Sequence, residues 1–135
     1  SWFLPRLVGM QTALEWCYTG RIFGAEEARA AGLVRSVHPR GELLGEARKL
    51  ALEIAENTSA VSVAMTRAMM WRLSSLDHPM KAHRVDSRSI YRLSRSADAG
   101  EGIASFLEKR PPDFPGRPSS DMPDFYPWWE EPEFE

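Results

Sequence analysis

Apolar residues recur at spacings of three and four along most of residues 1–110, which is the pattern of one face of an α-helix. Gly20 and Gly32 stand where two helices would end, Ser59 where one would begin, and Pro79 at the first position of another. The pattern predicts a mainly α fold of about five to seven helices, over roughly residues 9–20, 24–32, 41–57, 59–69, 79–95 and 97–110.

One segment departs from the helical pattern. In "LVRSVHP", residues 33–37 alternate between the two sides of an extended chain, and Pro39 follows. This alternation predicts one short strand over Leu33–Val37. A single strand cannot form a sheet alone, so it would pair with strands outside this sequence or lie at a sheet edge.

The stretch "ADAGEGIASFLEKRPPDF", residues 97–114, predicts a short helix with a sharp end. Asp98 and Glu101 have the spacing of a capping box, in which each side chain accepts a hydrogen bond from the other residue's backbone N–H. Ile103, Phe106 and Leu107 share one apolar face, as expected of residues that pack in a core.

Two basic residues, Lys109 and Arg110, are expected in the last turn of this helix, where the helix dipole stabilises cations, and prolines 111 and 112 would end it. Phe106 precedes Lys109 by three residues, so both lie on one face. Two interpretations remain open. Phe106 is a core residue and Lys109 a helix-end charge, or the ring and the ammonium together bind a ligand.

Composition adds several limits. The 135 residues are 43% hydrophobic and 27% charged, which is typical of one globular domain. The net charge of −2 argues against a non-specific nucleic-acid binder, and no apolar run approaches the roughly 20 residues of a membrane span. The single cysteine, Cys17, allows no internal disulfide, which suits a cytoplasmic protein. The start at Ser1 suggests a chain cut from a longer one.

The C-terminal tail, residues 111–135, differs in composition from the rest. It holds seven of the ten prolines and has a net charge of −6, whereas residues 1–110 carry +4. It also contains six aromatic residues beyond Asp113, which predicts that it docks on protein rather than remaining solvated. One candidate partner is a row of arginines at helical spacing, which otherwise forms a solvated helix face or an anion site: Arg84, Arg88, Arg92 and Arg95.

Residues with obvious catalytic or metal-binding spacing are not found. His38, His78 and His83 have no second ligand at metal-site spacing, and no nucleophile elbow or phosphate-binding glycine motif is present. Glu26 and Glu27 are adjacent and so cannot share a helix face. We therefore predict no catalytic residue and no metal site in this chain.

Four stretches taken in order resemble a known family. They are "LPRLVG" at 4–9, "ALEWCYTGRIFGAEEARAAGLVRSVHP" at 13–39, "LLGEARKLALEIAEN" at 43–57 and "EGIASFLEKRPPDF" at 101–114. Together they resemble the C-terminal half of the enoyl-CoA hydratase/isomerase, or crotonase, superfamily. The acidic aromatic tail extends past the usual family end.

The resemblance implies an α/β fold in which a spiral of ββα units precedes trimerisation helices. On that basis residues 1–40 would end the spiral, residues 41–110 would form a helical oligomerisation region, and residues 111–135 would be an added tail. Partners would be further copies in a trimer or hexamer, or a chain carrying the N-terminal half. The family's catalytic glutamates and oxyanion donors would lie upstream, so this chain would hold none of them.

The resemblance also implies a function. Phe106 and Lys109 match family positions that contact the adenine and phosphate end of coenzyme A, which is carried by the thioester substrate and is not a separate cofactor. The expected activity of the complete protein is the hydration of 2-enoyl-CoA in fatty-acid β-oxidation. Two alternatives remain: an enoyl-CoA isomerase, and a truncated, non-catalytic assembly module.

Overall fold

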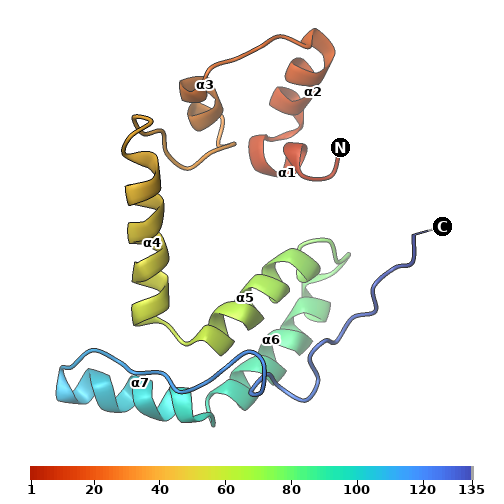
Figure 1. Cartoon of the computed structure of the whole chain (residues 1–135). Coiled ribbons are helices and arrows are strands. Elements are labelled where there is room, and N and C mark those ends of the chain that lie inside the picture. The colour runs from red at the N-terminus through yellow and green to blue at the C-terminus, as the bar shows by residue number, and fades with distance from the viewer. Residues whose placement is uncertain (135) are drawn as a thin grey trace. The chain divides into compact units, whose positions relative to one another are not determined.

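The computed structural model describes residues 1–134, and the described chain contains helices but no strand (Figure 1). The mainly helical prediction is therefore confirmed. The helices are α1 (Leu4–Val8), α2 (Met10–Thr19), α3 (Ala25–Ala30), α4 (Leu43–Asn57), α5 (Ala60–Leu73), α6 (Pro79–Leu93) and α7 (Ala97–Glu108). The chain divides into two compact units, Ser1–Lys49 and Leu50–Glu135.

The first unit is built around Trp16 of α2, which is buried. Its ring stacks on Phe23 with centroids 3.9 Å apart, and its indole N–H donates to Glu27 of α3 at 3.0 Å. Gly20 ends α2 in the left-handed conformation with φ of 59°, and its N–H bonds to the Trp16 carbonyl, as the sequence predicts. The small core of this unit is completed by Ala13 and Ala28.

The prediction of a strand over Leu33–Val37 is wrong. Gly32 has φ of 83°, a left-handed conformation that turns the chain at the end of α3. The N–H groups of Leu33 and Val34 then both donate to the carbonyl of Ala28, at 2.9 and 3.4 Å. These donors close the helix, so they are not available to a strand ladder.

The second unit contains α5, α6, α7 and the tail. Ser59 caps α5 by accepting the N–H of Ser62 at 3.2 Å, and Pro79 opens α6, both as predicted. α5 and α6 pack on each other, with Met65 of α5 and Ser89 of α6 almost completely buried. The other buried apolar side chains of this unit among the described residues are Val61, Ala68 and, from the tail, Pro123.

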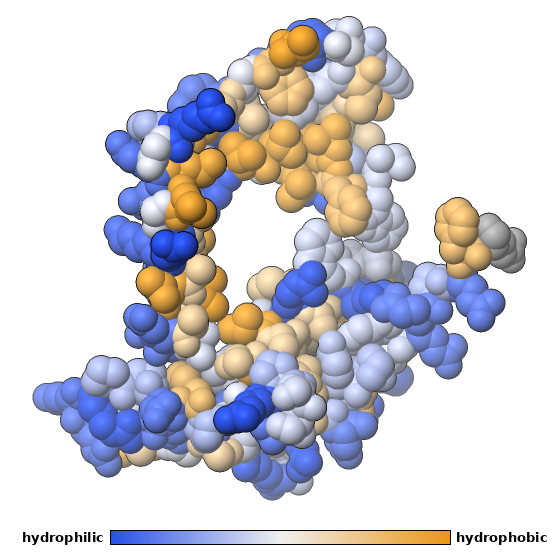
Figure 2. Space-filling model, in the orientation of Figure 1, coloured by the Kyte–Doolittle hydropathy of each residue, from blue (hydrophilic) through white to orange (hydrophobic). Residues whose placement is uncertain are grey.

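Many large apolar side chains lie at the surface instead. Figure 2 shows apolar side chains exposed over the N-terminal helices and along α4. In the first unit Tyr18 and Ile22 are among the most exposed, and α4 has no buried residue at all. A monomer rarely exposes so much apolar surface.

The tail is docked on the second unit, which confirms the expectation of a protein contact. It runs back along α7 and then passes α5 and α6 (Figure 1). The Arg88 guanidinium lies 4.3 Å from the centre of the Phe125 ring, and Arg72 lies 4.6 Å from the Trp129 ring and pairs with Glu131. Within the arginine row, Arg88 thus contacts one tail aromatic, Phe125, while Arg72, outside that row, contacts Trp129 and Glu131.

Candidate functional site

The start of α7 differs from the expected capping box. Ser96 is the N-cap residue and accepts the N–H of Ala99 at 3.2 Å. Asp98 lies inside the first turn, where it is 6% exposed. Its carboxylate accepts the Ser59 hydroxyl and, at 2.7 Å, the N–H of Gly116 from the tail. The prediction of a capping box at Asp98 is wrong. Ser96 has the extended backbone that a cap residue requires, so the helix starts before Asp98.

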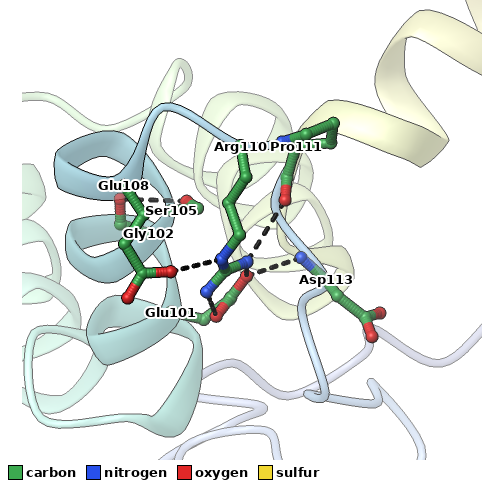
Figure 3. A network of polar contacts seen from close by, with 7 residues as sticks. All are labelled: Glu101, Gly102, Ser105, Glu108, Arg110, Pro111 and Asp113. Carbon is green, nitrogen blue, oxygen red and sulfur yellow. Dashed lines mark hydrogen bonds and ion pairs between the residues drawn. The ribbon is translucent and has the colours of Figure 1, made fainter.

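The second expected member of the box, Glu101, belongs to a polar cluster at the end of α7 (Figure 3). Arg110 donates to both oxygens of Glu101, at 2.6 and 2.9 Å, and through Nε to Glu108 at 2.6 Å. The backbone N–H of Asp113 also donates to Glu101, at 2.7 Å. We call Glu101, Glu108, Arg110 and Asp113 the α7 clasp.

The α7 clasp fixes the charge of Glu101. The Arg110 guanidinium, and after it the Asp113 N–H, lower the pKa of Glu101 to about 2. The two carboxylates raise the pKa of Arg110. Both side chains stay charged at neutral pH, and the paired geometry of the guanidinium and carboxylate adds directional precision.

Lys109 follows the last helical residue, Glu108, and is not in the final turn as expected. It has φ of 54° and ψ of 41°, and no other described residue except glycine has a positive φ. The Lys109 N–H bonds to the Phe106 carbonyl at 3.4 Å and the Arg110 N–H to the Ser105 carbonyl at 3.1 Å. This is a Schellman end, with lysine where glycine is usual.

Phe106 is 82% exposed, and its neighbours Ile103 and Leu107 are 64% and 71% exposed. The interpretation of Phe106 as a core residue is therefore wrong for this chain. Lys109 is also exposed and takes part in no ion pair among residues 1–134. Both lie at the end of α7, where the Lys109 N–H bonds to the Phe106 carbonyl, and we call them the Phe106–Lys109 surface.

Several other members of the "EGIASFLEKRPPDF" motif contact one another within the chain. Glu101 and Arg110 pair within the α7 clasp, and the ring of Phe114 lies 3.6 Å from where a Cβ atom on Gly102 would stand. The Glu101–Arg110 pair is satisfied within the chain, whereas a Cβ atom at residue 102 would make only an ordinary van der Waals contact with Phe114. These internal contacts leave Ile103, Phe106, Leu107 and Lys109 exposed.

The remaining carboxylates singled out in the sequence serve structural contacts. Arg21 bridges Glu15, at 3.1 Å, and Glu27. Arg21, and after it the Trp16 indole, lower the pKa of Glu27, and Glu26 pairs with Arg29 at 2.9 Å. Across residues 1–134 no three His, Cys, Asp or Glu side chains gather closely enough to hold a metal ion. Among the same residues, none of the helices is long and apolar enough to cross a bilayer.

Comparison with known proteins decides the family. The family model for enoyl-CoA hydratase/isomerase matches residues 1–117. The chain belongs to the enoyl-CoA hydratase/isomerase family. This match includes the seven helices of residues 1–134 and the α7 clasp, whereas the aromatic residues of the tail from Phe125 onward lie outside it.

Individual members of the enoyl-CoA hydratase/isomerase family are similar over most of this chain. Enoyl-CoA hydratase ACTT3 of Alternaria alternata is 41% identical over 115 residues, which are 84% of this chain and 38% of that protein. A probable enoyl-CoA hydratase of Rhodobacter capsulatus is 36% identical over 118 residues, or 87% of this chain and 45% of the relative. The chain thus spans less than half the length of these relatives.

Solved structures give the same result for the fold. A probable enoyl-CoA hydratase/isomerase from Mycobacterium abscessus superposes with a TM-score of 0.81 at 35% identity, over 86% of this chain and 47% of that one. The enoyl-CoA hydratase of Bacillus anthracis superposes with a TM-score of 0.79 at 32% identity, over 84% of this chain and 43% of that one. The helices of this chain are therefore arranged as in part of a crotonase fold.

Proposed function

We propose that this chain is the C-terminal part of an enoyl-CoA hydratase, and that the complete enzyme reversibly adds water across the 2,3 double bond of an enoyl-CoA. Support comes from the family match and from relatives whose names specify enoyl-CoA hydration. These names favour hydration over isomerisation as the reaction. The groups that add water would be supplied by the part of the fold that this chain does not cover.

The contribution of this chain to the site is the Phe106–Lys109 surface. Phe106 would lie against the adenine ring of CoA, because an exposed aromatic face offers a stacking or edge contact. Lys109 would bind a CoA phosphate, because an ammonium on a flexible stem is a mobile positive charge suited to phosphate. The observation that carries this assignment is that Phe106 and Lys109 are both exposed at the end of α7, while the charged residues Glu101 and Arg110 of the same motif pair with each other.

The second contribution is assembly. Ile103 and Leu107 extend the exposed apolar face beside Phe106, and the first unit exposes Tyr18 and Ile22. Apolar side chains in such numbers are expected to be covered by protein. We assign them to contacts with the rest of a crotonase fold and with further copies in a trimer or hexamer.

Activity measurements test whether the groups that add water lie in the part of the fold that this chain does not cover. The purified 135-residue chain, mixed with a short enoyl-CoA, should leave the conjugated thioester absorbance unchanged. A fusion of this chain to the N-terminal part of the Rhodobacter capsulatus relative should hydrate the same substrate, with the unaltered relative as positive control. A fusion that folds and assembles but binds no enoyl-CoA would refute the proposal, as would turnover by the chain alone.

The CoA contact is tested on this chain directly. CoA titrated into the isotope-labelled chain should shift the NMR signals of Phe106 and Lys109, because NMR detects even weak binding to a partial site. Lys109→Met should weaken this binding about tenfold, which corresponds to the loss of one charge-assisted phosphate contact. Dephospho-CoA, which lacks one phosphate, shows whether that phosphate is the one bound.

A further inference from the structure

We propose that Arg110 is a positioning residue: it holds Lys109 in the left-handed conformation and so aims the Lys109 ammonium at the phosphate it binds. The inference rests on the proposed CoA contact of Lys109 and adds to it the residues that set the direction of the contact. It follows from how the α7 clasp surrounds Lys109 in the chain.

Lys109 stands between two residues whose side chains are joined. Arg110 Nε donates to the Glu108 carboxylate at 2.6 Å, so the bridge spans the backbone of the residue between them. The two terminal nitrogens of the guanidinium donate to the two oxygens of Glu101, and one of them also donates to the Pro111 carbonyl at 3.2 Å. Figure 3 shows these contacts converging on Arg110.

The chain after Lys109 is fixed as well. Glu101 accepts the Asp113 N–H at 2.7 Å, so one carboxylate holds both the guanidinium and the returning backbone. The pKa of Glu101 is lowered to about 2, which keeps this carboxylate charged at neutral pH. The residues on both sides of Lys109 are therefore held, while the Lys109 side chain itself remains exposed.

The conformation held in this way determines where the ammonium points. A lysine within α7 would lean back toward the N-terminus of the helix, as helical side chains do. A left-handed backbone at residue 109 moves the Cα–Cβ bond out of that direction. Non-glycine residues seldom adopt this conformation, and strained backbone persists where surrounding contacts enforce it. The α7 clasp supplies such contacts.

A double-mutant cycle separates positioning from a general structural effect. CoA affinity is measured by NMR titration of the full chain for wild type, Lys109→Met, Arg110→Met and the double variant. If Arg110 acts through Lys109, Arg110→Met weakens CoA binding about fivefold or more in wild type and less than about twofold beside Lys109→Met. Arg29→Met, which breaks an exposed arginine–glutamate pair elsewhere, is the matched control and should change nothing.

Two further variants guard against a misfolded helix end. Glu101→Gln keeps an oxygen for the Asp113 N–H but loses the charge, and should show the same dependence on Lys109. Arg110→Lys keeps the charge without the two parallel bonds, and should restore part of the affinity. The one-bond Cα–Hα coupling of Lys109, which distinguishes positive from negative φ, should change in Arg110→Met while the helical signals of α7 remain.

The outcomes separate this inference from the proposed function. If Lys109→Met leaves CoA affinity unchanged, the CoA contact is refuted and the positioning role falls with it. Suppose that Lys109→Met weakens CoA binding. If Arg110→Met then has no effect, or weakens CoA binding equally in wild type and in Lys109→Met, only the positioning role is refuted. An unchanged Lys109 coupling in Arg110→Met also overturns it.

Discussion

The carboxylate of Asp98 accepts the backbone N–H of Gly116 at 2.7 Å, which ties the first turn of α7 to the returning chain. The approach is so close that a side chain at residue 116 has no room. A Cβ atom built on Gly116 would lie 2.8 Å from Cγ and 2.9 Å from Oδ1 of Asp98. Asp98 is buried and also holds the Ser59 hydroxyl, so it cannot move aside without breaking a second contact.

Gly116→Ala should therefore destabilise the fold. We expect a loss of about 1–3 kcal/mol, the usual range for forcing extra atoms into a packed site. Urea unfolding gives the free energy, and amide hydrogen exchange at Gly116 shows whether the contact with Asp98 is lost. Gly100→Ala is the control, since Gly100 lies in α7 with open space around it and should gain up to about 1 kcal/mol. Equal stability of Gly116→Ala and wild type would contradict the contact.

The low pKa of Glu101 predicts a specific pH dependence of stability. Its pKa is about 2 in the folded chain and 4.5 when unperturbed, so the unfolded chain binds the proton more readily. The contribution of Glu101 to the free energy of unfolding is complete above about pH 4.5, declines as the pH falls, and is lost near pH 2. Glu101→Gln should remove this part of the dependence, because it cannot titrate.

The difference in unfolding free energy between wild type and Glu101→Gln, measured across that range, isolates Glu101. Other carboxylates with lowered pKa values, including Glu27 and Glu131, act on both proteins and cancel in the difference. A difference that stays constant with pH would mean that Glu101 and Arg110 do not form the ion pair in solution.

The docked tail predicts that its aromatic residues, more than its charges, hold it in place. The centre of the Trp129 ring lies 5.2 Å from that of Tyr126 and 4.8 Å from that of Trp128, and the Arg72 guanidinium lies over the Trp129 ring. Each exposed cation–π contact is worth about 0.5–1 kcal/mol, and an exposed ion pair about the same or less. Trp129→Ala, which removes several contacts at once, should speed amide exchange in the tail more than Glu131→Gln.

Phe134→Ala provides the matched control for the tail, because the Phe134 side chain is fully exposed. Amide hydrogen exchange in the tail of Phe134→Ala should stay as slow as in wild type. A wild-type tail that exchanges as fast as an unfolded peptide would show that the docked arrangement is not maintained in solution.

Most helices of this fold could be predicted from the sequence, because local signals define them. Ser59 and Pro79 mark the starts of α5 and α6 through the backbone geometry they favour, and Gly20 ends α2 for the same reason. These effects depend on residues within one turn of the helix end. The predicted strand failed because alternation alone does not supply a pairing partner, and the N–H groups of Leu33 and Val34 bond to α3 instead.

The end of α7 was harder to predict because its partners are distant in sequence. Asp98 has the spacing of a cap, yet it bonds to Ser59 and Gly116, which are 39 and 18 residues away. Arg110 has the position of a helix-end charge, yet it pairs with Glu101. Phe106 has the spacing of a core residue, and only the structure shows that nothing in the described chain covers its face.

Replacing Lys109 in two ways should separate its backbone cost from its function. A non-glycine residue in the left-handed conformation costs about 1–2 kcal/mol, whereas glycine loses about 0.5–1 kcal/mol more entropy on folding. Lys109→Gly should therefore raise the unfolding free energy by roughly 0.5–1 kcal/mol. Lys109→Met keeps the strained backbone and the length of the side chain but loses the charge, so its stability should remain near that of wild type.

Both variants lack the ammonium, so both should bind CoA about tenfold more weakly, since 1.4 kcal/mol corresponds to a factor of ten. In the active fusion the loss should appear in KM rather than in kcat, because a remote phosphate contact is equal in the ground and transition states. Added salt should weaken wild type more than either variant, because screening acts on the charged contact. A more stable Lys109→Gly chain with reduced affinity would show that the fold keeps a strained lysine at residue 109 for binding. If Lys109→Gly is more stable and binds CoA as well as wild type, Lys109 has no role in the site.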